Sequence, residues 1–198
     1  MTLLLAASAG AQVRTVGLAG HFMSENRFKV SHEDRGTLYV NSYMPLVGAS
    51  LSYEANAGGA GSMFEVSYIN GKLYSVDQPG DYYIESWNID DFKDLTMVSA
   101  YYYYGFTLLS GHRLQFPLYF GLGVNYNAAD PINVLSLGLA AKARARFYFT
   151  DKLAVFGGVG WKGSIASEEL SGSDYRVKLD IGQRVLYFEA GLSFNIGM

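Results

Sequence analysis

The sequence predicts an all-β chain that closes into a single eight-stranded antiparallel up-and-down barrel crossing a membrane. Residues 134–149 alternate between an apolar and a polar row, which is the two-residue period of a strand. A run of this length crosses a bilayer when it is tilted. Seven further segments repeat the alternation, and most connections between them are short and long in turn. This sorting of loop lengths is typical of a membrane barrel with short periplasmic turns and longer extracellular loops.

The composition favours one β domain and excludes several other classes of protein. The chain has 198 residues with 16 Tyr, 12 Phe, 23 Gly and 17% charged residues, which suits strands with small-residue faces. The net charge of -3 argues against a nucleic-acid partner, which would need a basic patch. The absence of Cys excludes a disulfide framework and thiolate metal sites. No run of eighteen apolar residues occurs, so a membrane crossing must use strands.

The first residues predict an exported chain. Residues 3–7 form a short apolar core, and Ala9, Gly10 and Ala11 precede Gln12 in the manner of a small-residue cleavage site. We therefore expect residues 1–11 to be the remnant of a signal peptide and residues 12–198 to be the barrel domain.

The first half of the chain supplies three strands. A polar span follows the first strand, and residues 38–43 within it either extend a strand beyond the membrane edge or form part of a loop hairpin. Residues 56–61 are rich in Gly and predict a tight turn. The three strands are expected at 13–22, at 46–55 and from Ser62 onwards.

The second half supplies five strands, separated by an acidic span at 76–95 from the first three. Short turns are expected at 110–113 and 150–152, an intermediate connection at 127–133, and a third long acidic connection around Glu168, Glu169 and Asp174. Pro117 is tolerable near a strand start or at a bulge, because proline has no N–H to donate to a sheet ladder. The five strands are expected at 96–109, 114–126, 134–149, 153–165 and 185–198.

The whole mature chain resembles the small outer-membrane β-barrel proteins abundant in Bacteroidota-type bacteria, the OmpA-like transmembrane barrel class. The residues that carry the resemblance are the Ala9-Gly10-Ala11-Gln12 cleavage pattern, the alternating strands and the ending YFEAGLSFNIGM, which looks like the carboxy-terminal insertion signal of such barrels. A weaker likeness is to the conjugative-transfer barrels of the same bacteria. The resemblance implies an integral protein of the outer membrane of a Gram-negative bacterium.

Charged residues fall on the face opposite the apolar rows, so they point into the barrel if the apolar rows face lipid. An eight-stranded barrel has room only for its own side chains, and charges there must be paired. We expect a structural plug that fixes strand register, rather than a gated polar pathway. Its members are Glu54, Glu65, Lys142, Arg144, Arg146 and Glu189, and Lys162 points to the same side.

Aromatic residues predict an interfacial girdle rather than a sugar platform. The run 101–104 is four Tyr residues, but a strand sends them alternately to lipid and lumen. Trp161, Tyr126 and Tyr68 lie toward the outer strand ends, where an aromatic girdle is expected.

Candidate catalytic residues are few, and we expect neither catalytic residues nor a metal site nor a cofactor. The three His are His21 in the lumen phase, His32 in the first loop and His112 in a turn. Ser31, His32 and Asp34 supply the residue types of a hydrolase but as neighbours on a loop, which does not predict the geometry of a nucleophile and its base.

The expected function is a non-enzymatic one in envelope structure or in surface and partner interaction, carried by the extracellular loops. The expected partners are outer-membrane lipid and other envelope or surface proteins, without nucleic acid. Two alternatives remain open: a lipid-modifying barrel enzyme, and a secreted soluble lipocalin-like barrel whose apolar rows turn inward around a hydrophobic ligand. Periodicity alone does not separate inside from outside, and the loop lengths favour the membrane.

Overall fold

The structure is a computed structural model of the whole chain. It describes the backbone of 13–32, 36–42, 46–57, 59–72, 75–77, 94–111, 113–129, 132–171 and 176–197. Side chains are described over 13–23, 47–57, 59–71, 95–109, 111, 113–128, 133–167 and 182–197. The expected signal remnant and most of the acidic span 76–95 lie outside the described residues.

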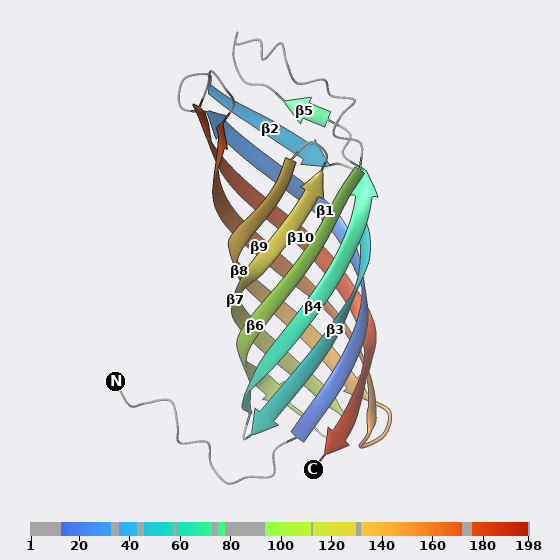
Figure 1. Cartoon of the computed structure of the whole chain (residues 1–198). Helices are drawn as coiled ribbons and strands as arrows, with labels where there is room; N and C mark the ends of the chain where they lie inside the picture. The colour runs from blue at the N-terminus through green and yellow to red at the C-terminus, as the bar shows by residue number, and fades with distance from the viewer. Residues whose placement is uncertain are drawn as a thin grey trace, which may run out of the picture.

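Eight of the described strands form one closed barrel. They are β1 (Val13–His32), β3 (Leu46–Ala57), β4 (Ala60–Lys72), β6 (Asp94–Ser110), β7 (Leu114–Ala129), β8 (Ile132–Tyr148), β9 (Leu153–Ser171) and β10 (Arg176–Gly197). Each pairs antiparallel with the next along the chain, and β10 pairs with β1 to close the sheet (Figure 1). The predicted fold class is therefore confirmed.

The two ends of the barrel differ. One end, the turn end, holds the start of β1, the end of β10 and the connections between β3 and β4, β6 and β7, and β8 and β9 (Figure 1). The opposite end, the loop end, carries two further strands, β2 (Gly36–Ser42) and β5 (Ser75–Asp77), of which β2 pairs with β1 and β5 with β2. The hairpin expected from residues 38–43 is thus present as β1 and β2.

Three strands run further toward the loop end than the sequence predicts. Strand β1 continues to His32, β9 continues to Ser171, and β10 already begins at Arg176. The expected long connection around Glu168, Glu169 and Asp174 is therefore wrong: only 172–175 separate β9 from β10, and only 130–131 separate β7 from β8. Backbone pairing continues there because ladder hydrogen bonds join main-chain groups whatever the side chains, whereas the prediction relied on alternating apolar and polar residues.

Local irregularities fall where the residue types predict them. Gly59 adopts a positive φ of 88° in the turn between β3 and β4, a conformation that favours glycine, and its carbonyl accepts a hydrogen bond from the Thr107 N–H at 2.7 Å. Opposite Pro117, the register of β6 against β7 shifts between Thr107 and Ser110. Pro117 thus lies beside a bulge, where its missing N–H interrupts no regular ladder.

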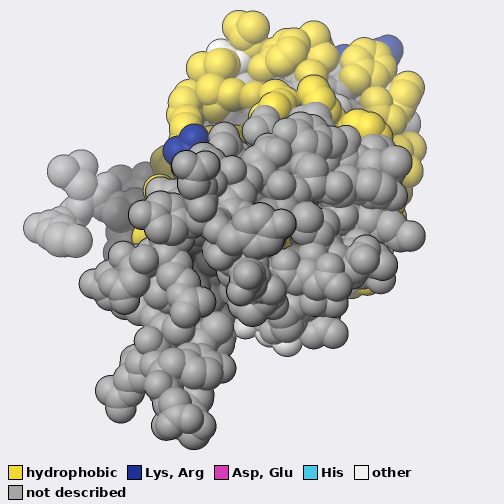
Figure 2. All heavy atoms as spheres, turned by 90° about the horizontal axis from the view of Figure 1, so that it is seen from above, with side chains coloured by type: hydrophobic (Ala, Val, Ile, Leu, Met, Phe, Trp, Pro, Cys, Tyr) yellow, Lys and Arg dark blue, Asp and Glu magenta, His cyan; other side chains and the backbone are white. Residues whose placement is uncertain are grey.

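The apolar rows face outward and the charged rows face inward. Leu137 is 71% exposed on the outer wall, whereas Lys142 is 4% exposed inside. The soluble lipocalin-like alternative is wrong for this fold, because it needs the opposite orientation. Seen from the loop end, the described side chains around the rim of the barrel are mostly apolar (Figure 2). The described residues contain no helix long and apolar enough to cross a membrane.

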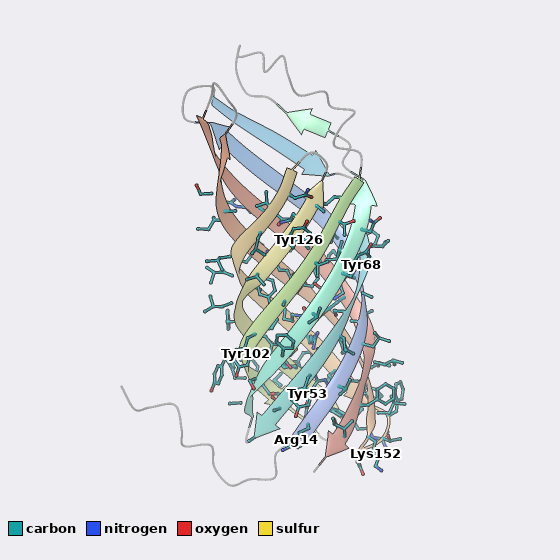
Figure 3. All side chains as sticks on the ribbon, viewed as in Figure 1. Arg14, Tyr53, Tyr68, Tyr102, Tyr126 and Lys152 are labelled. Atoms are coloured by element: carbon teal, nitrogen blue, oxygen red, sulfur yellow. The ribbon has the colours of Figure 1, made fainter. Side chains whose placement is uncertain are left out.

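Aromatic side chains divide between the two faces as predicted. Tyr101 and Tyr103 are buried in the lumen, whereas Tyr102 and Tyr104 lie on the outer wall. Tyr68 and Tyr126 lie toward the loop end of the outer wall, and Tyr53 and Tyr102 lie toward the turn end (Figure 3). Tyr68 and Tyr126 thus lie where the outer girdle was predicted. Trp161 does not, because β9 runs on to Ser171 and leaves Trp161 near its middle.

Candidate functional site in the barrel lumen

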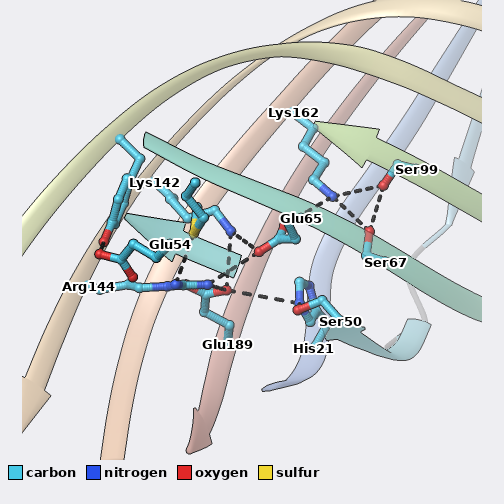
Figure 4. Close-up of polar contacts among 12 residues, drawn as sticks. His21, Ser50, Glu54, Glu65, Ser67, Ser99, Lys142, Arg144, Lys162 and Glu189 are labelled. Carbon is cyan, nitrogen blue, oxygen red and sulfur yellow. Dashed lines mark hydrogen bonds and ion pairs between the residues drawn. The ribbon is translucent and has the colours of Figure 1, made fainter. Parts of the chain in front are cut away.

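The lumen of the barrel gathers nearly all the buried charge of the described residues. Successive inward positions of β8 place three cations one above another, because alternate residues of a strand share a face. Carboxylates reach them from β3, β4 and β10 across the lumen (Figure 4). The four cations and three carboxylates are Lys142, Arg144, Arg146, Lys162, Glu54, Glu65 and Glu189.

The central cluster joins two carboxylates through two cations. Arg144 donates two hydrogen bonds to the Glu189 carboxylate, from Nε at 2.5 Å and from Nη2 at 3.1 Å. Its Nη2 also donates to Glu65 at 3.3 Å. Lys142 Nζ lies 2.5 Å from Glu65 and 3.5 Å from Glu189. Each carboxylate therefore meets both cations, which offsets the cost of burying four charges together.

A second cluster lies nearer the turn end. Arg146 donates to Glu54 from Nη2 at 2.5 Å and from Nη1 at 3.4 Å. Glu54 also accepts hydrogen bonds from the Tyr119 hydroxyl and from Asn56 Nδ2. The carboxylate thus has three donors, whereas the guanidinium relies on this one carboxylate among the described residues.

Lys162 lies toward the loop end of the central cluster and is held differently. Its Nζ donates to the hydroxyls of Ser67 and Ser99 at 3.0 and 2.9 Å, and its nearest carboxylate oxygen, on Glu65, is 3.9 Å away. The rings of Tyr101 and Tyr187 lie 5.0 and 5.3 Å from the ammonium nitrogen, within cation–π range.

A layer of uncharged polar side chains lies in the lumen further toward the loop end. It consists of amides and hydroxyls that bond mainly to one another: Asn127 Nδ2 donates to Gln183 at 3.1 Å, and Ser136 Oγ donates to Ser164 at 3.0 Å. Asn125 Nδ2 donates to the Tyr101 hydroxyl at 2.8 Å. Together with the ion clusters this layer lines the lumen with hydrogen-bonded side chains along the described strands.

His21 is the one imidazole whose side chain the structure describes, and its surroundings superficially resemble those of a hydrolase. Its Nε2 lies 2.7 Å from Ser50 Oγ and 3.9 Å from Glu189. In a catalytic triad the carboxylate orients the other ring nitrogen, but here both groups face Nε2, and Nδ1 has no hydrogen-bond partner among the described residues. His21 is also buried and stacked on Tyr187 with ring centroids 5.0 Å apart.

The same region contains a group of candidate metal ligands. His21, Glu65 and Glu189 each offer one ligand atom, and these atoms lie within 4.8 Å of one another. Both carboxylates already bind Lys142 and Arg144. A divalent cation would have to displace the ammonium of Lys142 and the guanidinium of Arg144 from both carboxylates. The arrangement therefore favours ion pairs over metal binding.

The structure brings the predicted network residues together, but as two clusters rather than one. Glu54 and Arg146 form one cluster, and the other four residues form the second. Ser50, Ser67 and Ser99 were not predicted from the sequence as partners of His21 and Lys162. The available signal was that all three serines occupy inward-facing positions of their strands. Serine is too common at such positions for this to identify particular partners.

Comparisons with known proteins agree on the fold. No protein-family model and no curated protein sequence matches the chain. Among solved structures, the outer membrane protein OprG from Pseudomonas aeruginosa is similar with a TM-score of 0.68 and 10% identity, covering 96% of this chain and 97% of that one. The outer membrane protein AlkL, solved in lipid bilayers, gives a TM-score of 0.52 at 11% identity, covering 100% of this chain and 97% of that one.

A third similar structure is an enzyme. The outer membrane protease OmpT from Escherichia coli gives a TM-score of 0.50 at 9% identity, covering 93% of this chain and 97% of that one. At such identities the likeness shows the fold alone, which is that of outer-membrane β-barrels. The narrower resemblance to OmpA-like proteins of Bacteroidota stays a prediction.

Proposed function

We propose that the chain is a non-enzymatic integral protein of the outer membrane of a Gram-negative bacterium, and that its lumen is a structural plug. The observation that carries this proposal is the inverted polarity of the barrel: leucines such as Leu137 cover the outside, and the ion clusters occupy the inside. Such a wall is stable only against lipid, because water on the outside would leave dozens of apolar side chains exposed.

The proposed work of the molecule is to hold its loop end at the cell surface. Strands β1, β9 and β10 project beyond the rest of the wall there, and β2 and β5 extend the sheet (Figure 1). We infer that this projection carries the contacts with other envelope or surface proteins, since a lumen that acts as a plug leaves no path for a solute.

Two measurements on one preparation test the proposal. In an unboiled sample on a denaturing gel, the membrane-extracted protein should migrate differently from a boiled sample, because a closed barrel resists detergent. Reconstituted in a planar bilayer, the same folded protein should give no conductance above that of the bare bilayer. Recovery in the soluble periplasmic fraction contradicts the membrane assignment, and steady channel currents contradict the plug.

The lipid-modifying enzyme is tested separately at His21, whose contact with Ser50 is the feature among the described side chains that favours it. We expect His21→Ala and Ser50→Ala to leave the lipid A of the host cell unchanged in mass spectra. A lipid A species that is present with the wild type and missing with both variants would instead establish an enzyme.

A further inference from the structure

Two hollows lie along β8 and β9 in the described part of the outer wall, an upper one nearer the loop end and a lower one nearer the turn end. The upper hollow has a volume of about 660 Å³. Its outer lining includes Leu137, Trp161 and Arg184, and between β8 and β9 it reaches Ser164 and Gln183 of the uncharged lumen layer. The lower hollow, of about 260 Å³, is lined by Ala141, Ala143, Val159, Leu186 and again Trp161. The two hollows follow one another along β8 and β9 with Trp161 lining both, and we call them together the β8–β9 groove.

Small residues create the groove. The outward row of β8 changes from leucine at Leu139 to alanine at Ala141 and Ala143, so the wall becomes thinner toward the turn end. Gly163 has no side chain of its own, and the Trp161 indole lies where a Cβ on Gly163 would project. Trp161, which lines both hollows, therefore lies at the centre of the groove.

The β8–β9 ladder also ends inside the upper hollow. The last pair toward the loop end is Leu137 with Ile165. Beyond it, within the described strands, β8 pairs only with β7 and β9 only with β10. The strand edges that face each other there offer unpaired backbone N–H and C=O groups to a polar ligand.

One end of the groove is positively charged. Among the described side chains, the exposed charged residues are Arg14, Arg113, Asp151 and Lys152 at the turn end, and Arg184 in the upper hollow. Arg184 has no ion-pair partner among the described residues. The groove therefore has a cationic end toward the loops and an apolar end toward the middle of the wall.

The length of the groove fits one acyl chain. Leu137 to Ala143 covers six residue steps of β8, or about 20 Å at about 3.3 Å per residue. With strands tilted by about 40°, this is about 15 Å along the membrane normal, which is half of a hydrocarbon core of about 30 Å.

We propose that the β8–β9 groove binds an anionic lipid of the surrounding leaflet, with its charged headgroup at Arg184 and one acyl chain running past Trp161 to Ala143. This proposal rests on the proposed function, since it needs the barrel to lie in a membrane with the loop end at one surface. Along the wall, Arg184 lies toward the loop end and the apolar part of the groove lies toward the middle. In one leaflet, the lipid headgroup and the acyl chain follow the same order.

The fluorescence of Trp161 tests the proposal, because this indole would touch the bound chain. The chain has two Trp residues, so Trp87→Phe leaves Trp161 as the single reporter. The protein is reconstituted in phosphatidylethanolamine vesicles with a minor fraction of brominated phosphatidylglycerol, or with the same fraction of brominated phosphatidylethanolamine. We expect phosphatidylglycerol to quench as though enriched about fivefold beside Trp161, as befits one cation near a membrane surface.

Matched variants separate the groove from the rest of the wall. Arg184→Ala should abolish the preference for phosphatidylglycerol, whereas Arg14→Ala at the opposite end should keep it. Ala143→Phe, which fills the lower hollow, should weaken the preference, and Ala190→Phe on the exposed wall outside the groove should not. A folded wild type that is quenched equally by both lipids, or an unchanged preference in Arg184→Ala, overturns the groove proposal.

The heat-dependent gel shift of each sample keeps two failures apart. A wild type that shifts on boiling but shows no lipid preference overturns the groove proposal and leaves the proposed function standing. A wild type that neither inserts into the vesicles nor shifts on boiling overturns both.

Discussion

At the scale of single residues, the lumen pairs each carboxylate with more than one donor, but not every cation with more than one acceptor. Glu54 receives bonds from Arg146, Tyr119 and Asn56, whereas Glu54 is the carboxylate that Arg146 contacts among the described residues. Removing either member of a buried ion pair leaves a charge that neither water nor a partner stabilises. The cost should therefore depend on which member is removed.

We expect Glu54→Met to lower the free energy of unfolding by about 3 to 5 kcal/mol, because Arg146 loses its carboxylate. Arg146→Met should cost less, since Tyr119 and Asn56 still bond Glu54. The double variant should be more stable than Glu54→Met alone. Urea unfolding in lipid vesicles measures all three, and equal losses in the two single variants would contradict this asymmetry.

Glycines of the lumen make room for aromatic rings. The Tyr187 ring lies where a Cβ on Gly160 would project, whereas a Cβ on Gly20, on the outer wall, would meet nothing closer than the Ala190 carbonyl oxygen at 3.9 Å. Gly160→Ala should thus destabilise the barrel by about 1 to 3 kcal/mol through overpacking, and Gly20→Ala should not. The same unfolding experiment compares them; an undiminished stability in Gly160→Ala would show that Tyr187 can move away.

At the scale of the elements, the sequence predicts strands well only where two different solvents meet. Over 134–149 the contrast between lipid and lumen imposes a strict alternation, and β8 is found at Ile132–Tyr148. Toward the loop end that contrast disappears, so the continuation of β1 to His32 leaves no periodic signal although its backbone still pairs with β10.

The same reasoning explains what was predictable in the lumen. Alternation assigns Glu54, Arg146 and Lys162 to the inner face, because phase along one strand is a local property. It does not assign partners, because Glu54 and Arg146 are 92 residues apart and meet across the lumen. The division into two clusters and the serine partners of Lys162 depend on the register of all eight strands.

Closure between β1 and β10 is the pairing that turns the sheet into a barrel, and Val16 and Phe194 are directly paired across it. Since the chain contains no Cys, Val16→Cys with Phe194→Cys gives a clean test. We expect a disulfide on mild oxidation of the folded protein, seen as altered mobility without reductant. Val16→Cys with Phe106→Cys, on strands that are not neighbours, is the control; cross-linking in both pairs or in neither would contradict the observed closure.

At the scale of the whole molecule, the fold separates three environments with one sheet. The outer wall is apolar, as the proposed contact with lipid requires. The lumen pairs its own charges, and the turn end carries exposed charged residues such as Lys152 (Figure 3). With the lumen acting as the proposed plug, exchange with partners would occur at the ends or along the wall. The β8–β9 groove is a feature of the described wall that suits such an exchange.

The orientation of the molecule in the membrane follows from the ends. Asn133 is exposed at the start of β8 toward the loop end, and Lys152 is exposed in the turn between β8 and β9. If the loop end faces the outside, Asn133→Cys in intact cells should react with a maleimide that cannot cross the outer membrane. Lys152→Cys should react only after that membrane is permeabilised. The reverse pattern would place the projecting strands β1, β9 and β10 in the periplasm, and the partners would then have to be sought on that side.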